Sequence, residues 1–148
     1  MKLGELLSSK DFKYSVLVTV GQDETVSVAI RSLAEHDRGS LPVHDDKGDL
    51  VGIITERDIV RNCVAHSKDC AKMKVRDVMS KQVVVGIPED DLDYAISVMK
   101  QKRIRHLPIV DNKKVLGMIS MRDLFGVQLE ESKTHVRFLS DYISGGYG

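Results

Sequence analysis

The sequence predicts an α/β (α+β) fold in which two β-α-β-β-α repeats pack with pseudo-twofold symmetry, followed by a C-terminal helix. Two observations lead to this prediction. The phrase GIITERDIV at 52–60 returns as GMISMRDLF at 117–125, and LPV at 41–43 aligns with LPI at 107–109. Two copies of one phrase, each with the same neighbouring phrase, indicate a structural unit that occurs twice.

Each repeat shows the same order of expected elements. A short run rich in β-branched residues comes first, at 16–20 and again at 83–87, and suits a strand. A helix with one apolar face follows. Its i, i+3, i+4 and i+7 positions are Val26, Ala29, Ile30 and Leu33 in the first copy and Leu92, Ala95, Ile96 and Met99 in the second. Two apolar runs around a polar turn then predict a hairpin, with its proline at a strand entrance or edge.

The alignment divides the chain into three parts. The first repeat with an N-terminal segment covers 1–70, the second repeat covers 71–130, and 131–148 holds a C-terminal helix and tail. KLGELLS at 2–8 resembles KVRDVMS at 74–80, so the two repeats also open alike. One repeat of this size would be marginally stable alone, and two copies can cover each other's apolar faces.

Composition narrows the classes of function. Lys plus Arg and Asp plus Glu both total 22, and aromatic residues make up 5% of the chain. Balanced charge and few stacking side chains argue against nucleic-acid binding. No apolar run reaches the roughly 20 residues of a membrane span, and the N-terminus does not resemble a signal peptide, so we expect a cytoplasmic protein with no membrane partner.

Catalysis and metal binding find no support in the motifs. The chain has no GxxxxGK[ST] or GxGxxG loop, no nucleophile paired with a base, and no HExxH pattern, so we expect no enzyme and no metal site. Cys63 and Cys70 match neither a CxxC redox motif nor a zinc motif. We therefore expect two ordinary thiols near a helix end, with no disulfide framework.

Two hydroxyl–carboxylate pairs are the candidate binding groups. Thr55 with Asp58, and Ser120 with Asp123, lie where a strand runs into a helix. Their spacing is that of a capping box, with Asp in place of the usual Glu, and capping alone could explain each pair. A helix N-terminus also attracts phosphate, and a carboxylate suits ribose hydroxyls. The combination favours a nucleotide, and glycine at 52 and 117 would allow close backbone approach.

Cationic residues near these pairs are candidate phosphate ligands. Arg105 and His106 directly precede the second LPI strand, and a guanidinium can bind phosphate through two hydrogen bonds. Ser40 stands where the second copy has His106. We therefore expect unequal clefts, with the stronger phosphate site at Asp123. Arg57 and Arg122 precede the two aspartates and could pair with them, with phosphate or with another subunit.

The doubled motif, each copy preceded by LPV or LPI, resembles a pair of CBS domains, known as a Bateman module. The likeness covers roughly residues 1–130, and DRGSLPV and RFLSDYISGGYG resemble segments of small stand-alone CBS-pair proteins of bacteria and plant organelles. The resemblance implies a non-catalytic regulatory module. Such modules bind AMP, ADP, ATP, and sometimes NAD or S-adenosylmethionine, in two clefts between the repeats.

The family pattern also assigns roles to individual positions. It places the two aspartates on ribose and the two hydroxyls on phosphate or ribose. The positions implied around the purine are Val16, Val18, Arg38 and Gly39 facing Asp123, and Ser80, Val84, Ile104 and Arg105 facing Asp58. In this chain Gln22 stands where the second copy has Pro88, a departure between the repeats.

The resemblance further implies partners. CBS pairs commonly form a homodimer, helix against helix, and a stand-alone module would transmit its ligand state to a separate regulated protein. The candidate dimer surface lies on the two motif helices and includes Ile59, Cys63, Leu124 and Val127, some of which could belong to the core instead, since the sequence does not separate the two places. The alternative is a scaffold that dimerises or binds partners with its clefts empty.

Overall fold

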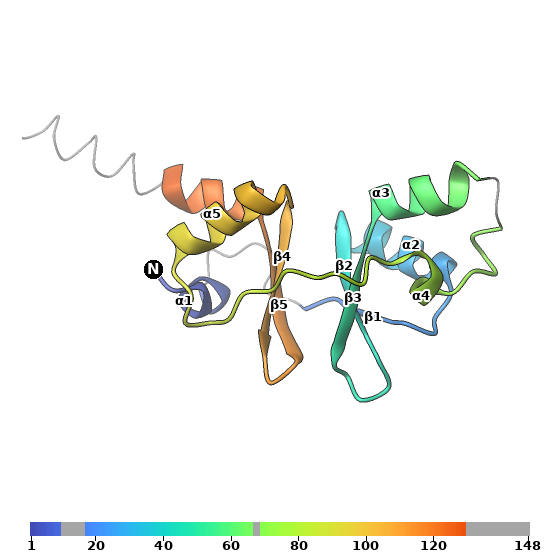
Figure 1. Ribbon diagram of the computed structural model, residues 1–148, viewed down its shortest axis with the longest axis horizontal. Helices are drawn as coiled ribbons and strands as arrows, with labels where there is room; N and C mark the ends of the chain where they lie inside the picture. Colours follow the sequence, from blue (N-terminus) through green and yellow to red (C-terminus); the bar gives the residue numbers. More distant parts are fainter. Residues whose placement is uncertain (10–16, 67–68, 130–148) are drawn as a thin grey trace, which may run out of the picture.

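The computed structural model describes residues 1–9, 17–66 and 69–129 of the chain (Figure 1). Two hairpins stand next to each other in the middle of the molecule, and the helices lie on their outer sides. The first repeat lies on the right of Figure 1 and the second on the left. This arrangement confirms the predicted mixed fold of two similar units. Residues 131–148, and with them the expected C-terminal helix, lie outside the described residues.

The first repeat builds a three-stranded sheet in the order β1-β2-β3. Its elements are β1 (Val20–Gly21), α2 (Val26–Glu35), β2 (Ser40–His44), β3 (Leu50–Thr55), α3 (Glu56–Ile59) and the π-helix η1 (Val60–Val64). β2 and β3 pair antiparallel, as the predicted hairpin requires, and β1 runs parallel to β2. On α2 the expected core positions 26, 29 and 33 are buried, whereas Ile30 is 41% exposed, so its placement on the core face was wrong.

The second repeat repeats the helix, hairpin and motif helix. Its elements are α5 (Leu92–Lys102), β4 (His106–Asp111), β5 (Lys114–Ser120) and a helical segment at 121–129. β4 and β5 pair antiparallel. All four predicted core positions of α5 are buried, which confirms its apolar face.

The strand predicted at 83–87 does not form. Only Gly86 pairs there, in a single parallel bridge with Ile109. The Gly86 amide donates to the Pro108 carbonyl and the Val110 amide donates to the Gly86 carbonyl. The next bond of a parallel ladder would run from the amide of residue 108 to the carbonyl of residue 84, and proline has no N–H to donate. Pro108 is the third residue of β4, inside the strand, and stops the ladder on that side.

The helix that begins each repeat in the sequence packs in the core of the other repeat. Residues of α1 (Leu3–Leu7) are buried in the core of the second repeat, and residues of α4 (Val75–Val78) are buried in the core of the first. Matching backbone bonds hold both: the Gly4 amide donates to Pro88, and the Arg76 amide donates to Gln22. The division at residue 70 stays a prediction about the sequence, and each core draws its opening helix from the other side of that residue.

The two hairpins also meet at their turns. The Leu50 amide donates to the Lys113 carbonyl at 2.9 Å, and the Lys114 ammonium donates to Asp49 Oδ1 at 2.7 Å. This hydrogen bond from Lys114 lowers the pKa of the Asp49 carboxyl. These contacts and the exchanged helices tie the repeats into one unit.

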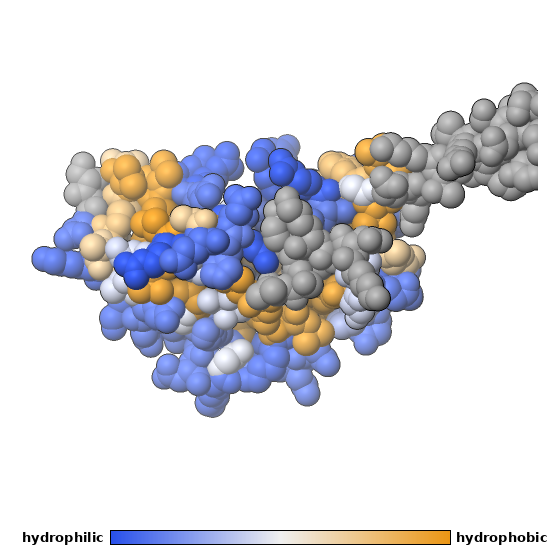
Figure 2. Space-filling view, turned by 180° about the vertical axis from the view of Figure 1, so that it is seen from behind, coloured by the Kyte–Doolittle hydropathy of each residue, from blue (hydrophilic) through white to orange (hydrophobic). Residues whose placement is uncertain are grey.

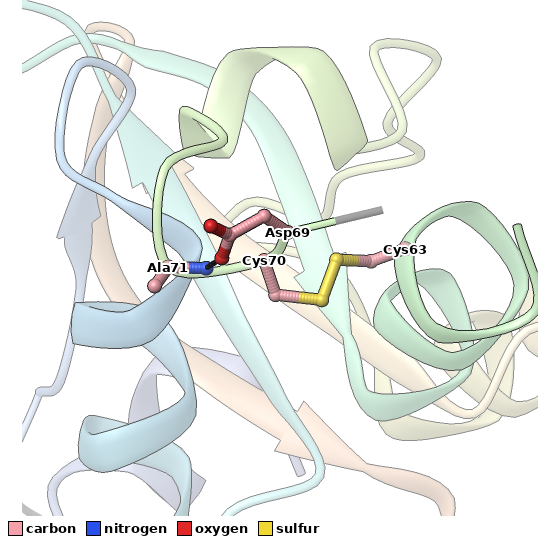
Figure 3. Close-up of a disulfide and its surroundings, with 4 residues drawn as sticks. All are labelled: Cys63, Asp69, Cys70 and Ala71. Carbon is pink, nitrogen blue, oxygen red and sulfur yellow. Dashed lines mark hydrogen bonds between the residues drawn. A yellow bond between two sulfur atoms is a disulfide. The ribbon is translucent and has the colours of Figure 1, made fainter. Parts of the chain in front are cut away.

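Cys63 and Cys70 form a disulfide (Figure 3). The expectation of two ordinary thiols was therefore wrong. The spacing in sequence matches no redox motif, but η1 ends beside the turn at 69–72 and the two Cα atoms come within 5.8 Å. That distance lies within the range that a disulfide spans. The bond closes a short loop between the first motif helix and the segment that leads into α4.

Candidate functional site

The first hydroxyl–carboxylate pair forms a complete capping box at the start of α3. Thr55 Oγ1 accepts a hydrogen bond from the Asp58 amide at 3.0 Å, and Asp58 Oδ2 accepts one from the Thr55 amide at 3.1 Å. The two side chains thus fix the angle at which β3 enters the helix. The predicted capping role is confirmed, and it uses one of the two oxygens of Asp58.

The second pair repeats this geometry with one difference. Asp123 Oδ2 accepts from the Ser120 amide at 2.8 Å, and Ser120 Oγ accepts from the Asp123 amide at 3.1 Å. The Ser120 hydroxyl also donates to Asp123 Oδ2 at 2.8 Å. The hydroxyl proton of Ser120 is therefore used in a bond to the carboxylate, and this hydroxyl cannot donate to a ligand unless that bond is given up.

Each aspartate keeps one oxygen outside the capping box. Asp58 Oδ1 faces the Ser80 hydroxyl at 3.4 Å, and no residue in the described parts of the chain donates a hydrogen bond to Asp123 Oδ1. Both side chains are half-buried. A half-buried carboxylate oxygen with room for a donor is suited to a hydroxyl-bearing ligand, because a charged acceptor makes the stronger hydrogen bonds.

Ser80 is held beside Asp58 by backbone bonds to β3. Its amide donates to the Ile53 carbonyl at 2.9 Å, and its carbonyl accepts from the Ile53 amide at 3.0 Å. The placement of Ser80 next to Asp58 agrees with the family-based expectation. This contact joins the first motif to the segment that follows α4.

The glycines of the repeated phrase are needed where the exchanged segments cross the strands. A Cβ atom at Gly52 would stand 2.9 Å from the Ser80 carbonyl oxygen and 2.5 Å from Met79 Sδ. A Cβ at Gly117 would stand 2.7 Å from Leu7 Cδ2. The groups that come close to these glycines belong to the exchanged segments of the protein itself: backbone and side-chain atoms at Gly52, and a side chain at Gly117. A close approach by a ligand stays a prediction.

A groove of about 680 Å³ lies beside the first motif. It is lined by Arg76, Asp77, Met79, Ser80, Lys81 and Gln82. The Arg76 guanidinium pairs with Asp23, while Lys81 takes part in no salt bridge among the residues that the structure describes. Sequence reasoning missed these two cations. The signal that could have found them is the second copy of the opening phrase, KVRDVMSK, which carries both.

His106 and Gly39 bring the two repeats together between the motifs. The imidazole carbon Cε1 and nitrogen Nε2 of His106 lie 3.7 Å from the position of a Cβ at Gly39. Burial lowers the pKa of His106 from its usual 6.5, the Asp123 charge opposes this shift, and the Arg105 charge adds to it. The imidazole is therefore neutral at pH 7 and can donate one ring N–H.

Ser40 takes the place of His106 in the first repeat and has a different environment. Its side chain is 4% exposed, and its hydroxyl has no hydrogen-bond partner within the described segments. The first repeat thus has a small buried hydroxyl at the position where the second repeat has the ionisable ring of His106. The predicted inequality of the two sites therefore has a structural counterpart, although the affinities themselves stay a prediction.

The remaining predicted residues fall into three groups. Val18 packs on the first core, and Val84 and Ile104 pack on the second. Arg57, Arg105 and Arg122 are exposed, whereas Arg38 is half-buried. Val16 lies outside the described residues.

Neither a metal cluster nor a membrane span is found in the described parts of the chain. Among the described residues, no three His, Cys, Asp or Glu side chains are grouped as a metal ion would require. In the same stretches of chain, no helix combines the length and apolarity needed to cross a bilayer.

A family model settles the relationship of the chain to known proteins. The model of the CBS domain matches twice, at residues 9–65 and 75–130, which is more than half of the chain. This protein belongs to the CBS domain family. The two matches coincide with the two repeats.

Several known CBS proteins resemble the chain along most of its length. The CBS domain-containing protein CBSX3, mitochondrial, of Arabidopsis thaliana is 33% identical over 84% of this chain, which spans 63% of that protein. The CBS domain-containing protein YhcV of Bacillus subtilis is 35% identical over 79% of this chain and 82% of its own length.

Solved structures confirm the fold. A putative signal-transduction protein with CBS domains from Burkholderia ambifaria superposes with a TM-score of 0.79 at 31% identity, covering 88% of this chain and 95% of that one. The CBS domain pair of protein MJ0100, solved in complex with 5′-methylthioadenosine and S-adenosyl-L-methionine, has a TM-score of 0.76 at 23% identity, covering 88% and 98%. At that identity the second comparison shows the fold alone.

Proposed function

We propose that this CBS pair is a non-catalytic regulatory module that binds an adenosyl nucleotide, AMP, ADP, ATP or NAD, beside Asp58 and Asp123. The observation that carries the proposal is the doubled capping box in which each aspartate keeps one oxygen outside the cap. That oxygen can accept hydrogen bonds from ribose hydroxyls, while the helix start and the nearby cations face a phosphate. The MJ0100 domain pair, which shares the fold, was solved with two adenosyl ligands and shows that this fold can hold a ligand of that class.

The two sites are proposed to be unequal. The second site combines Asp123 with Arg105 and with the N–H of a neutral His106, and the first offers the buried Ser40 hydroxyl at the matching place. We keep the second site as the stronger phosphate site. The groove cations Arg76 and Lys81 lie beside the first site and would contact the tail of a nucleotide bound there.

A thermal-shift experiment tests the proposal. A ligand at about 100 times its dissociation constant adds roughly 2.7 kcal/mol of stability, which is a clear shift in Tm. We expect AMP, ATP or NAD to raise Tm, and adenine without ribose to leave it unchanged. The absence of a shift with every adenosyl compound would favour the alternative, a scaffold whose clefts stay empty.

A homodimer is proposed to form through the two motif helices. Of the candidate surface residues, Ile59, Cys63 and Leu124 are buried in the cores, which is the alternative that the sequence had left open for them. The apolar residues exposed on these helices form one i, i+4 pair per repeat: Val60 with Val64, and Phe125 with Leu129. Both helices lie along the upper edge of Figure 1, and apolar surface covers the same places in Figure 2.

The dimer has a direct test. Val64, which is 60% exposed, would become buried in the dimer, so Val64→Glu is expected to give a monomer in analytical ultracentrifugation, because burying an unpaired charge is costly. Leu116→Glu is the matched control, since Leu116 is 45% exposed on β5, away from the motif helices. A Val64→Glu dimer as stable as the original would refute this surface.

The ligand state is proposed to reach a separate regulated protein. A ligand can change the binding of such a partner only if the ligand itself binds two conformational states of the module with different affinity. The cytoplasm stays the proposed compartment, and fractionation of cells that produce the chain tests it. A pull-down with and without ATP, using Asp58→Asn/Asp123→Asn as a control, would identify a partner whose capture depends on ligand.

A further inference from the structure

The disulfide joins two segments that meet at the first site. Cys63 lies in η1 and is fully buried, whereas Cys70 is half-buried. Asp69 holds the turn around Cys70: its Oδ1 accepts from the Ala71 amide at 3.1 Å (Figure 3). Its carbonyl accepts from the Lys72 amide at 3.2 Å. The turn presents Cys70 to the motif helix.

The same two segments lead into the walls of the first site. On one side, η1 continues α3, which begins at the capping box of Asp58. On the other side, the segment after Cys70 runs through α4 into Met79, Ser80 and Lys81, which line the groove. Besides the disulfide, Asn62 Nδ2 donates to the Val78 carbonyl at 3.4 Å, a long hydrogen bond. The disulfide is thus a strong cross-link between the motif helix and the groove wall.

The second repeat has no such link. Gln128 stands where the first repeat has Cys63, and residues 121–129 are α-helical. In the first repeat the helix changes to π winding at Val60–Val64, and the Ala65 amide donates to the Val60 carbonyl, five residues earlier, at 2.8 Å. Short π segments are uncommon and often occur at functional sites. Cys63 lies inside this π segment, so the disulfide acts on the unusual helix alone.

We propose that the Cys63–Cys70 disulfide is a redox switch, opened by a dithiol reductant, that sets the nucleotide affinity of the first site and leaves the second site unchanged. The inference rests on the proposed function for its ligand. Opening the bond frees the turn at 69–72 from η1, and the π segment can return to α winding. The groove wall then loses its cross-link to the helix of Asp58, and the first site binds nucleotide more weakly.

The exchange reaction follows from the burial of the two sulfurs. A thiolate of the reductant attacks Sγ of the half-buried Cys70, and Cys63 leaves as a thiolate that takes up a proton. The second thiol of the reductant then displaces Cys70 and closes its own disulfide. Two electrons and two protons pass to the cysteine pair. In a cytoplasmic protein, as predicted here, disulfides are rare and are usually transient, catalytic or redox-sensing.

The test separates the two sites by mutation. In the Asp123→Asn variant ATP binding reports on the first site, and in Asp58→Asn it reports on the second. Titration before and after dithiothreitol is expected to show about fivefold weaker binding at the first site, the size expected when one or two ordered side chains are released. Binding at the second site is expected to stay the same. Unchanged affinity at the first site, with complete reduction confirmed by mass spectrometry, would overturn the proposal.

A second variant and a ligand-free measurement complete the test. Asp123→Asn/Cys70→Ser is expected to bind ATP as weakly as the reduced protein, with or without dithiothreitol. Hydrogen exchange without ligand is expected to show faster exchange at the Ala71 and Lys72 amides after reduction, since the turn that Asp69 holds is then no longer tied to η1. If ATP binds neither site in either redox state, the proposed function fails. The hydrogen-exchange rates still test the switch separately, because equal rates in the oxidised and reduced protein would refute it.

Discussion

The two repeats build the same motif and then diverge within one helical turn. Both aspartates close a capping box with a hydroxyl three residues earlier. After that point the first helix winds into a π segment that is cross-linked through Cys63, and the second continues as an α-helix. Ahead of the motif, a buried serine in one repeat corresponds to a half-buried histidine in the other. The two repeats thus share the capping box and differ in the residues around it.

The largest expected difference concerns the aspartates. Replacing Asp123 by Asn removes a charged acceptor and is expected to weaken ATP binding about ten- to a hundredfold, and Asp58→Asn is expected to have the smaller effect on total binding. Isothermal titration calorimetry measures both. Asp46→Asn, in the exposed β2–β3 turn, is the control. Equal losses at the two sites would contradict the predicted inequality.

The next largest expected effect is a difference in stability between variants of the two motif glycines. Gly52→Ala is expected to lower the free energy of unfolding by about 2–3 kcal/mol, because its Cβ meets the backbone oxygen of Ser80 at 2.9 Å. Gly117→Ala meets the flexible end of Leu7, which can move aside, and is expected to cost less. Urea unfolding measures both variants. If Gly117→Ala proved the more destabilising, the packing of α1 against β5 would be tighter than that of α4 against β3.

The disulfide is expected to stabilise the first repeat alone. Cys70→Ser is expected to lower the free energy of unfolding by about 2 kcal/mol, since the bond restricts the unfolded chain across a short loop. The measurement is urea unfolding with and without dithiothreitol. Reduction should remove the difference between the variant and the original protein. A difference that persists in dithiothreitol would place the effect in packing at position 70 and not in the covalent bond.

The smallest expected effect belongs to His106. Its pKa is lowered in the folded protein, mainly by burial, so the unfolded chain binds a proton first as the pH falls. The stability that depends on the neutral imidazole is therefore complete above the unfolded pKa of 6.5 and is lost as the pH drops toward the lowered folded pKa. His106→Gln should reduce the slope of Tm against pH below 6.5. His36→Gln, at the exposed end of α2, is the control.

Much of this architecture could be predicted from local patterns. The hairpins, the buried face of α5 and both capping boxes follow from spacings of a few residues, and the structure contains them. The missing strand at 83–87 depends instead on the absent N–H of Pro108 in another segment. The disulfide likewise depends on how η1 and the turn at 69–72 meet in space. Both features depend on how separate segments meet in space, and such contacts leave no periodic signal in the sequence.

The geometry of the candidate site was predicted in part, and its role in ligand binding stays a prediction. The two aspartates and their hydroxyl partners were found because the motif occurs twice in register. Arg76 and Lys81, in and just after the segment at 74–80, were missed. The likeness of that segment to residues 2–8 does not reveal which repeat each segment packs against. The roles of Val18, Val84 and Ile104 in ligand binding stay predictions, and their packing against the cores is what the structure adds.

The exchanged opening helices have a mechanical consequence. Tension applied to the N-terminus would load the second repeat first, because α1 packs there, although the first repeat follows it along the chain. A protease cut between the repeats would leave two fragments that remain interlocked, each keeping a helix in the other's core. A deformation that begins in one repeat is therefore carried into the other by the packing of the exchanged helices as well as by the connecting backbone.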